Sequence, residues 1–166
     1  KTVDLCSGSG AIAVALDKIS GAKVTAVEID ETAFSYLETN VKENNSSVKP
    51  VMADALEICE TFADGELDLI VSNPPYIKSA DIETLQKEVR LEPRLALDGG
   101  EDGYDFYREI VSRWSRKLKK GGALAFELGE NQADAVKALM TDKGFSDFKI
   151  SLDFGGVQRA IIGTLL

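Results

Sequence analysis

Short runs of aliphatic and β-branched residues alternate along this chain with longer stretches in which apolar residues recur every three or four positions. This alternation predicts strands separated by amphipathic helices. We expect strands near 1–6, 23–28, 48–52, 67–72, 122–128, 146–153 and 158–165. We expect helices over 10–19, 31–43, 105–119 and 130–143, shorter helices near 55–62 and 81–89, and helix stops at Gly21, Gly121-Gly122 and Gly144.

The order of these elements predicts an α/β fold. Strand–helix–strand repeats form right-handed crossovers between parallel strands, which helices then bury on both faces. Only a few residues, including Gly155-Gly156, join the last two strands, so these two should form an antiparallel hairpin. The sequence thus predicts a three-layer sandwich with a mainly parallel seven-stranded sheet and a C-terminal antiparallel hairpin. Ligands bind such sheets at the carboxyl ends of the strands.

The polar segment from Lys78 to Gly103 resists regular assignment beyond one short helix. It follows a strand end, so we interpret it as a candidate lid or substrate loop.

Composition narrows the class of partner. The chain has 19 basic and 28 acidic residues and a net charge of -9, so it should repel a DNA or RNA duplex. It has no histidine, and Cys6 and Cys59 form no C-x-x-C pair, so we expect no metal site. The absence of a membrane-length apolar run and of a leader favours a cytoplasmic protein without a membrane partner. We expect a monomer.

A glycine-rich turn follows the first strand: Asp4-Leu5-Cys6-Ser7-Gly8-Ser9-Gly10. Glycines between a strand and a helix let a ligand approach the backbone and the helix N-terminus. Asp4, inside the strand, is interpreted as orienting this turn or facing a ligand amino group, since a buried carboxylate is costly unless paired. The spacing of Gly8, Gly10 and Ala13 also fits a dinucleotide-binding enzyme.

Two further acids follow strand ends. Glu28 closes the second strand, where a carboxylate can accept both hydroxyl hydrogens of a ribose. Asp54, after the third strand, is placed to reach the amino group of an adenine. The sequence therefore predicts a nucleoside-type ligand.

The buried strand 67–72 runs directly into the tetrad Asn73-Pro74-Pro75-Tyr76. The two prolines fix the backbone, so the Asn73 side chain and the Pro74 carbonyl should face the pocket rigidly. Together they can accept both hydrogens of a planar NH2 group, such as an amide or an exocyclic amine. Such a nitrogen is a weak nucleophile that two in-plane acceptors orient and enrich in electron density. Tyr76 is predicted to stack on the target plane.

Five tracts resemble the HemK/PrmC-type protein-(glutamine-N5) methyltransferases across nearly the whole chain. They are Asp4 to Ala13, Ile70 to Ile77, Glu88 to Pro93, Ala96 to Gly103 and Glu127 to Gln132. The resemblance implies the class I methyltransferase fold and the use of S-adenosyl-L-methionine, with S-adenosyl-L-homocysteine as product. It implies that Cys6 to Gly10, Glu28, Ala55 and Asn73 line the donor site, beside Asp4 and Asp54, and that Asn73 to Tyr76 bind the glutamine of the Gly-Gly-Gln motif of peptide-chain release factors.

Two positions depart from the family pattern. Cys6 stands where members usually carry Gly, a modest change if the backbone there has a negative φ, and Glu28 stands where Asp is common. The chain also starts inside the first strand, so residues 1–166 are interpreted as a catalytic domain whose upstream substrate-binding domain is missing. Three alternatives remain open: an adenine-N6 or other amino methyltransferase acting on DNA or RNA, a non-catalytic binding module, and a nicotinamide oxidoreductase.

Overall fold

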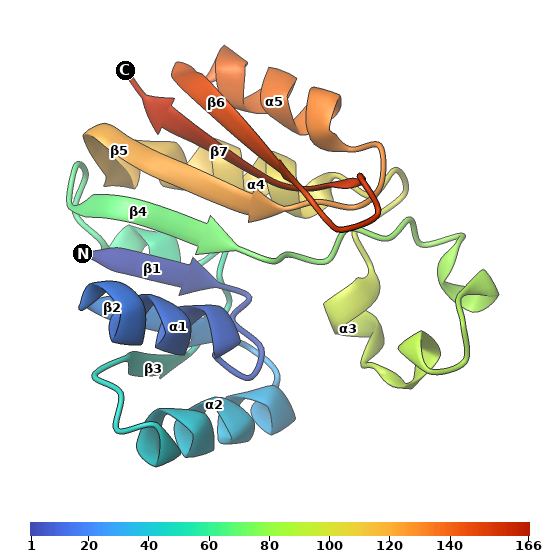
Figure 1. Cartoon of the computed structure of the whole chain (residues 1–166), viewed down its shortest axis with the longest axis horizontal. Coiled ribbons are helices and arrows are strands. Elements are labelled where there is room, and N and C mark those ends of the chain that lie inside the picture. The colour runs from blue at the N-terminus through green and yellow to red at the C-terminus, as the bar shows by residue number, and fades with distance from the viewer.

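The computed structural model describes all residues 1–166, and its centre is one seven-stranded sheet in the order β3-β2-β1-β4-β5-β7-β6 (Figure 1). All pairs are parallel except those of β7, which runs antiparallel to β5 and β6. This confirms the predicted sheet and its C-terminal hairpin. The strands are β1 (Thr2–Leu5), β2 (Val24–Glu28), β3 (Lys49–Met52), β4 (Leu67–Ser72), β5 (Leu118–Glu127), β6 (Phe145–Leu152) and β7 (Gln158–Leu165).

Helices lie on both faces of the sheet (Figure 1). They are α1 (Ala11–Ser20), α2 (Glu31–Glu43), α3 (Arg94–Leu97), α4 (Asp105–Trp114) and α5 (Ala133–Asp142). Short 3₁₀ turns span Ile58–Thr61, Ile82–Thr84, Val89–Leu91 and Ser115–Lys117. None of the helices combines the length and the apolar character that crossing a membrane requires.

The two sides of the sheet bury unequal cores. A cluster of 20 buried residues, including Tyr107, Trp114 and Phe126, fills the space between the sheet and α4 and α5. A cluster of five packs α1 and α2 against β2 and β3, around Leu37. On this second side, Leu69 of β4 and Ile162 of β7 are only half-buried. The larger core therefore holds the middle of the sheet, where β1 and β4 end side by side.

The helix predicted over 105–119 ends earlier, at Trp114, and Gly121-Gly122 does not stop it. The buried Lys117 explains the difference, because its Nζ donates to the Phe62 carbonyl and to Asp64 Oδ1, each at 2.8 Å. These contacts fix the chain just before Leu118, so β5 already begins there and pairs with β4. Gly121, with φ 78°, lies within the strand at a register shift.

Three other helical predictions need correction. Residues 55–62 and 81–89 form 3₁₀ turns rather than α-helices, and α3 follows them at a place where no helix was predicted. The helix predicted over 130–143 begins only at Ala133, because residues 129–132 form a turn in which Asn131 has φ 62°. The other predicted helices, 10–19 and 31–43, are confirmed as α1 and α2.

Candidate active site

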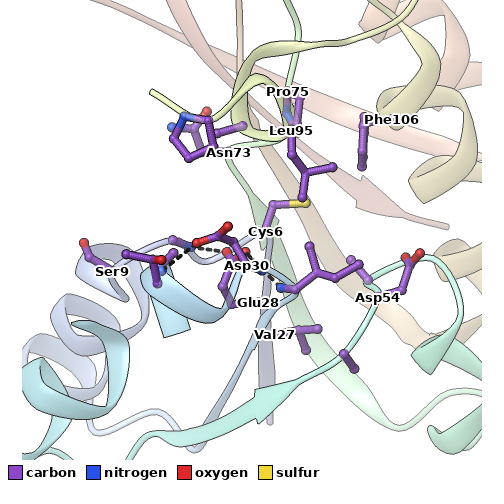
Figure 2. A pocket seen from close by; sticks show the side chains of 18 of the residues that line it. Cys6, Ser9, Val27, Glu28, Asp30, Asp54, Asn73, Pro75, Leu95 and Phe106 are labelled. Carbon is purple, nitrogen blue, oxygen red and sulfur yellow. Dashed lines mark hydrogen bonds between the residues drawn. The ribbon is translucent and has the colours of Figure 1, made fainter. Parts of the chain in front are cut away.

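A cavity of about 540 Å³ opens at the carboxyl ends of β1, β2 and β4. Segments far apart in the sequence line it, as Figure 2 shows: the glycine turn, the start of α2, the residues after β3, the tetrad, α3 and Phe106. The cavity brings together seven of the predicted donor-site residues, namely Cys6, Gly8, Ser9, Glu28, Asp54, Ala55 and Asn73. The predicted residues Asp4, Ser7 and Gly10 lie outside its lining.

The two glycines of the turn serve different purposes. Gly8, with φ 54°, lines the cavity, and a Cβ there would meet no atom within 4 Å. Gly10, with φ 82°, faces α2, because a Cβ there would lie 2.3 Å from Leu37 Cδ1. Gly8 thus gives a ligand access to the backbone, whereas Gly10 lets α1 and α2 approach each other.

The sequence predicts that a cysteine in place of glycine is a modest change only if φ at residue 6 is negative. Cys6 has φ 55°, so this condition is not met. The left-handed conformation costs a residue with a Cβ about 1–2 kcal/mol. In Figure 2 its sulfur lies in the middle of the cavity, below Leu95 and Pro75. Burial, followed by the charge of Glu28, raises the pKa of the Cys6 thiol to about 12, so the group is a neutral thiol near pH 7.

The Glu28 carboxylate holds the glycine turn and the start of α2 together. Its Oε2 accepts from the Gly8 N–H at 2.7 Å, and its Oε1 accepts from the N–H groups of Ile29 at 2.9 Å and Asp30 at 2.8 Å. A carboxylate offers about four acceptor positions, so one remains on Oε2. The geometry therefore favours one ribose hydroxyl at Glu28, rather than the two predicted from sequence.

Asp4 and Ser7 both carry buried oxygen atoms without hydrogen-bond partners. Neither oxygen of the fully buried Asp4 carboxylate has a hydrogen-bond partner, and the buried Ser7 Oγ has none either. Burial, the largest cause, raises the pKa of Asp4 to about 7; the nearby Ala13 N–H, which is outside normal hydrogen-bond geometry, partly opposes the shift, and the charge of Glu28 adds to it. Buried polar groups without partners are costly, and protonation of Asp4 lowers that cost.

The residues after β3 form the far wall of the cavity. Asp54 Oδ1 accepts from the Leu56 N–H at 2.7 Å, which leaves Oδ2 without a protein partner. The carbonyl of the buried Ala55 accepts from Trp114 Nε1 at 2.8 Å, so this wall is tied to α4. Its position is thereby fixed by the larger core.

The tetrad follows β4 without a break, but only part of it lines the cavity. Asn73 and Pro75 do so, whereas Pro74 is buried beside them. The Asn73 carboxamide is exposed and makes no hydrogen bond within the chain, so both its polar ends are free for a ligand. Tyr76 points elsewhere: it is half-buried, and its hydroxyl makes a long 3.5 Å contact with Glu127 Oε1.

Several lining residues were not predicted as site residues. They are Val27, Ile29, Asp30, Thr32, Ala33, Tyr36, Ala53, Leu56, Glu92, Pro93, Leu95, Ala96 and Phe106. Ser72 was also missed: it does not line the cavity, but its hydroxyl donates to the Leu5 carbonyl at 2.8 Å and joins the end of β4 to the glycine turn. Among the lining residues, Glu92, Pro93, Leu95 and Ala96 come from one segment. These four belong to the predicted lid segment 78–103. Tyr36 and Leu95 are exposed apolar side chains in the structure, a feature that the sequence alone does not reveal.

All the charged side chains that line the cavity are acidic. It contains four carboxylates, those of Glu28, Asp30, Asp54 and Glu92, and no lysine or arginine. This charge favours a cationic ligand and disfavours a pyrophosphate. The dinucleotide alternative is therefore weakened at the site itself.

Comparison with known proteins places the chain in a family. Residues 1–92 match the family model described as "Methyltransferase small domain", which covers more than half of the 166 residues. The chain belongs to this family. The match includes both the glycine turn and the tetrad, whereas Pro93, Leu95, Ala96 and Phe106 of the cavity lining lie beyond it.

Curated relatives narrow the comparison. The chain is 42% identical over 165 residues to "Release factor glutamine methyltransferase" of Geobacter sulfurreducens, covering 98% of this chain and 57% of the relative. A relative of the same name from Clostridium acetobutylicum is 36% identical and is covered to 58%. These similarities confirm the resemblance drawn from the motifs. The chain spans just over half the length of these relatives.

Solved structures show the same fold. A methyltransferase from Pyrococcus furiosus superposes with a TM-score of 0.75 at 24% identity, covering 98% of this chain and 73% of that one. A precorrin-6y C5,15-methyltransferase from Geobacter metallireducens gives 0.69 at 14% identity, covering 99% and 78%. At such identities the likeness shows the class I methyltransferase fold alone.

Proposed function

We propose that this chain is the catalytic domain of an enzyme that transfers a methyl group from S-adenosylmethionine to the side-chain amide nitrogen of the glutamine in the Gly-Gly-Gln motif of release factors. The observation that carries the proposal is the Asn73 carboxamide, which makes no hydrogen bond within the chain. It precedes two prolines and lies at the edge of an acidic cavity. The names of the curated relatives support the choice of acceptor.

The cavity fits the donor. Its volume of about 540 Å³ lies within the usual range of small-molecule sites. Glu28 would accept a ribose hydroxyl and Asp54 Oδ2 an adenine amino group. When bound, S-adenosylmethionine supplies an electrophilic methyl group on a positively charged sulfur, which the four carboxylates of the lining would stabilise.

The tetrad would bind the acceptor. The Asn73 carboxamide oxygen and the Pro74 carbonyl would accept the two hydrogens of the glutamine NH2 group, because both are acceptors on a rigid turn. This contact would fix the nitrogen and raise its electron density, so the chain needs no strong base before the methyl group is transferred. We assign Tyr76 to the outer wall of the acceptor site, beside Glu127, rather than to the donor cavity.

The setting of the reaction follows from the proposed substrate. Release factors act in translation, so we place the enzyme in the cytoplasm. We propose that the enzyme is a monomer. The additional length of the relatives leads us to propose that residues outside 1–166 help to bind the release factor.

Methyl transfer by the full-length protein tests the proposal. Donor labelled in its methyl group is incubated with a release factor, with the same factor carrying Gln→Ala in its Gly-Gly-Gln motif, and with DNA and RNA. We expect label in the unmodified release factor alone. Label in nucleic acid, lost steeply as salt rises, would support an amino methyltransferase of that class instead. Donor binding without any transfer would support a non-catalytic module.

A further inference from the structure

Gln132 is a buried glutamine at the start of α5 whose amide does not cap that helix. Instead its side chain turns toward the tetrad. Nε2 donates to the Tyr76 carbonyl at 3.1 Å and to the Gly103 carbonyl at 3.2 Å. Oε1 accepts from the Gly129 N–H at 2.9 Å and from the Tyr107 hydroxyl at 3.2 Å.

The two bonds of Nε2 use both hydrogens of the amide, and Oε1 accepts one full bond from Gly129 and a shared one from Tyr107. They join four separate segments: the tetrad, the end of the segment 78–103, α4 and the turn after β5. The Tyr107 hydroxyl has a single hydrogen, which it shares between Gln132 Oε1 and the Glu127 carbonyl at 2.8 Å, so the network extends to the end of β5. A buried network of this kind fixes the relative positions of its members.

The surrounding glycines show how closely the backbone packs here. A Cβ at Gly99 would lie 2.7 Å from Tyr76 Cα, and a Cβ at Gly103 would lie 2.6 Å from the Tyr76 carbonyl oxygen. A Cβ at Gly129 would lie 2.6 Å from Gln132 Oε1. The Tyr76 backbone is therefore enclosed by glycines at two places, Gly99 and Gly103, and Gly129 packs against the Gln132 amide.

We propose that Gln132 is a positioning residue for methyl transfer: its amide holds the Tyr76 carbonyl and thereby fixes the orientation of Asn73 and Pro74. Gln132 does not line the cavity, so it acts through the tetrad and not on either substrate. The role depends on donating two hydrogens to two carbonyl oxygens, which neither a carboxylate nor a thioether can do. The kinetic test of this role rests on the proposed function, whereas the hydrogen-exchange test does not.

Two variants and one matched control test the role in the full-length protein. Gln132→Glu keeps the shape and removes the donor pair, and Gln132→Met removes all hydrogen bonding at similar volume, in case the first variant folds poorly. Asn131→Asp makes the same amide-to-acid change one residue earlier, at an exposed side chain. We expect both Gln132 variants to lower kcat roughly tenfold or more, with donor Kd changed by less than about threefold, because two buried carbonyls lose their partner.

Hydrogen exchange gives a readout that needs no activity. The Ile77 N–H donates to the Leu97 carbonyl at 2.9 Å, and the Gly99 N–H donates to the Ile77 carbonyl at 2.8 Å, directly beside Tyr76. We expect these two amides to exchange roughly tenfold faster in Gln132→Met than in Asn131→Asp, while the amides of α1 are unchanged.

The possible outcomes separate the two proposals. Failure of the wild-type protein to methylate a release factor overturns the proposed function, and the exchange rates at Ile77 and Gly99 still decide the role of Gln132. Wild-type kcat and wild-type exchange in a folded Gln132→Met overturn the positioning role. The positioning role is also overturned if the loss of activity is explained by weaker donor binding or by a smaller folded fraction, with kcat unchanged.

Discussion

The glycine turn at residues 4–10 and the tetrad at residues 73–76 line the same cavity, but their backbones are fixed differently. The turn contains three positive φ angles, at Cys6, Gly8 and Gly10. The tetrad contains none, and two prolines and its contacts with distant glycines restrain it. The donor end thus exposes backbone through unusual conformations, whereas the acceptor end excludes alternative conformations. Damage to the first should weaken donor binding, and damage to the second should slow transfer.

The largest effect is expected for Asn73→Ala. The change removes one of two acceptors that orient the nucleophile, so we expect kcat to fall about a hundredfold or more. Donor Kd should rise by less than about tenfold, since the other lining groups remain. Steady-state kinetics and calorimetry on the same preparation check the pair of values. If donor Kd rose enough to account for the whole loss of activity, the distinction between the two ends would be refuted.

Glu28→Gln should act on the donor end. The amide keeps one oxygen, so its NH2 group would face either the Gly8 N–H or the N–H groups of Ile29 and Asp30, and no remaining bond would be charge-assisted. We expect donor Kd to rise roughly thirtyfold and the free energy of unfolding to fall by about 2 kcal/mol. Glu38→Gln, the same change at an exposed position of α2, is the control. Unchanged donor affinity in Glu28→Gln would show that Glu28 does not contribute to donor binding.

Gly103→Ala tests the close packing around the tetrad. Gly103 has φ 82°, and its added Cβ would lie 2.6 Å from the Tyr76 carbonyl oxygen. Gly65 has φ 66° with no atom within 4 Å, so Gly65→Ala carries the backbone strain without the contact. We expect Gly103→Ala to lose about 1–2 kcal/mol more stability than Gly65→Ala, and to lower kcat. Equal stability in urea unfolding would contradict the packing argument.

Asp4 makes the stability of the donor end depend on pH. Its pKa is raised from 3.8 to about 7 in the folded state, so the folded state binds more protons than the unfolded one between these values. Stability therefore decreases as pH rises through this window. We expect Asp4→Asn to gain roughly 2 kcal/mol relative to wild type between about pH 5 and pH 8. Parallel unfolding curves at the two pH values would refute a titration of Asp4.

The smallest effect is expected for Cys6→Gly. Relief of a φ of 55° is partly offset by the greater entropy of unfolded glycine, so the net gain should be about 0.5 kcal/mol. Cys6→Ala keeps the strain and removes the sulfur, so it should give no gain. Thermal unfolding compares the two variants. A larger gain for Ala than for Gly would show that the thiol, not the backbone, is the source of the cost.

The same contrast explains what could be predicted from the sequence. Strand and helix periods, the Gly-rich turn and the Asn-Pro-Pro-Tyr tract are local patterns, so the sheet, its hairpin and the two ends of the cavity were predictable. The early end of α4 was not, because Lys117 is held by Phe62 and Asp64 across the fold. The contact of Gln132 with Tyr76, 56 residues away in the sequence, was equally hidden.

Individual side-chain directions were also beyond local patterns. Tyr76 follows two prolines in a ligand-binding tract, yet its ring turns toward Glu127 because Gly99 and Gly129 leave space there for its backbone and ring. Gly10 fits a ligand-binding fingerprint, but its lack of a Cβ accommodates Leu37. Patterns identified which segments meet, and packing decided which residue of each segment reaches the cavity.

The most direct test of the central claim is tandem mass spectrometry of the release-factor peptide that contains the Gly-Gly-Gln motif, after incubation with the full-length protein and S-adenosylmethionine. We expect one added methyl group on the side-chain nitrogen of that glutamine, formed by the wild-type protein and not by Asn73→Ala. A methyl group on any other residue, or equal methylation by Asn73→Ala, would contradict the claim that the tetrad binds this amide.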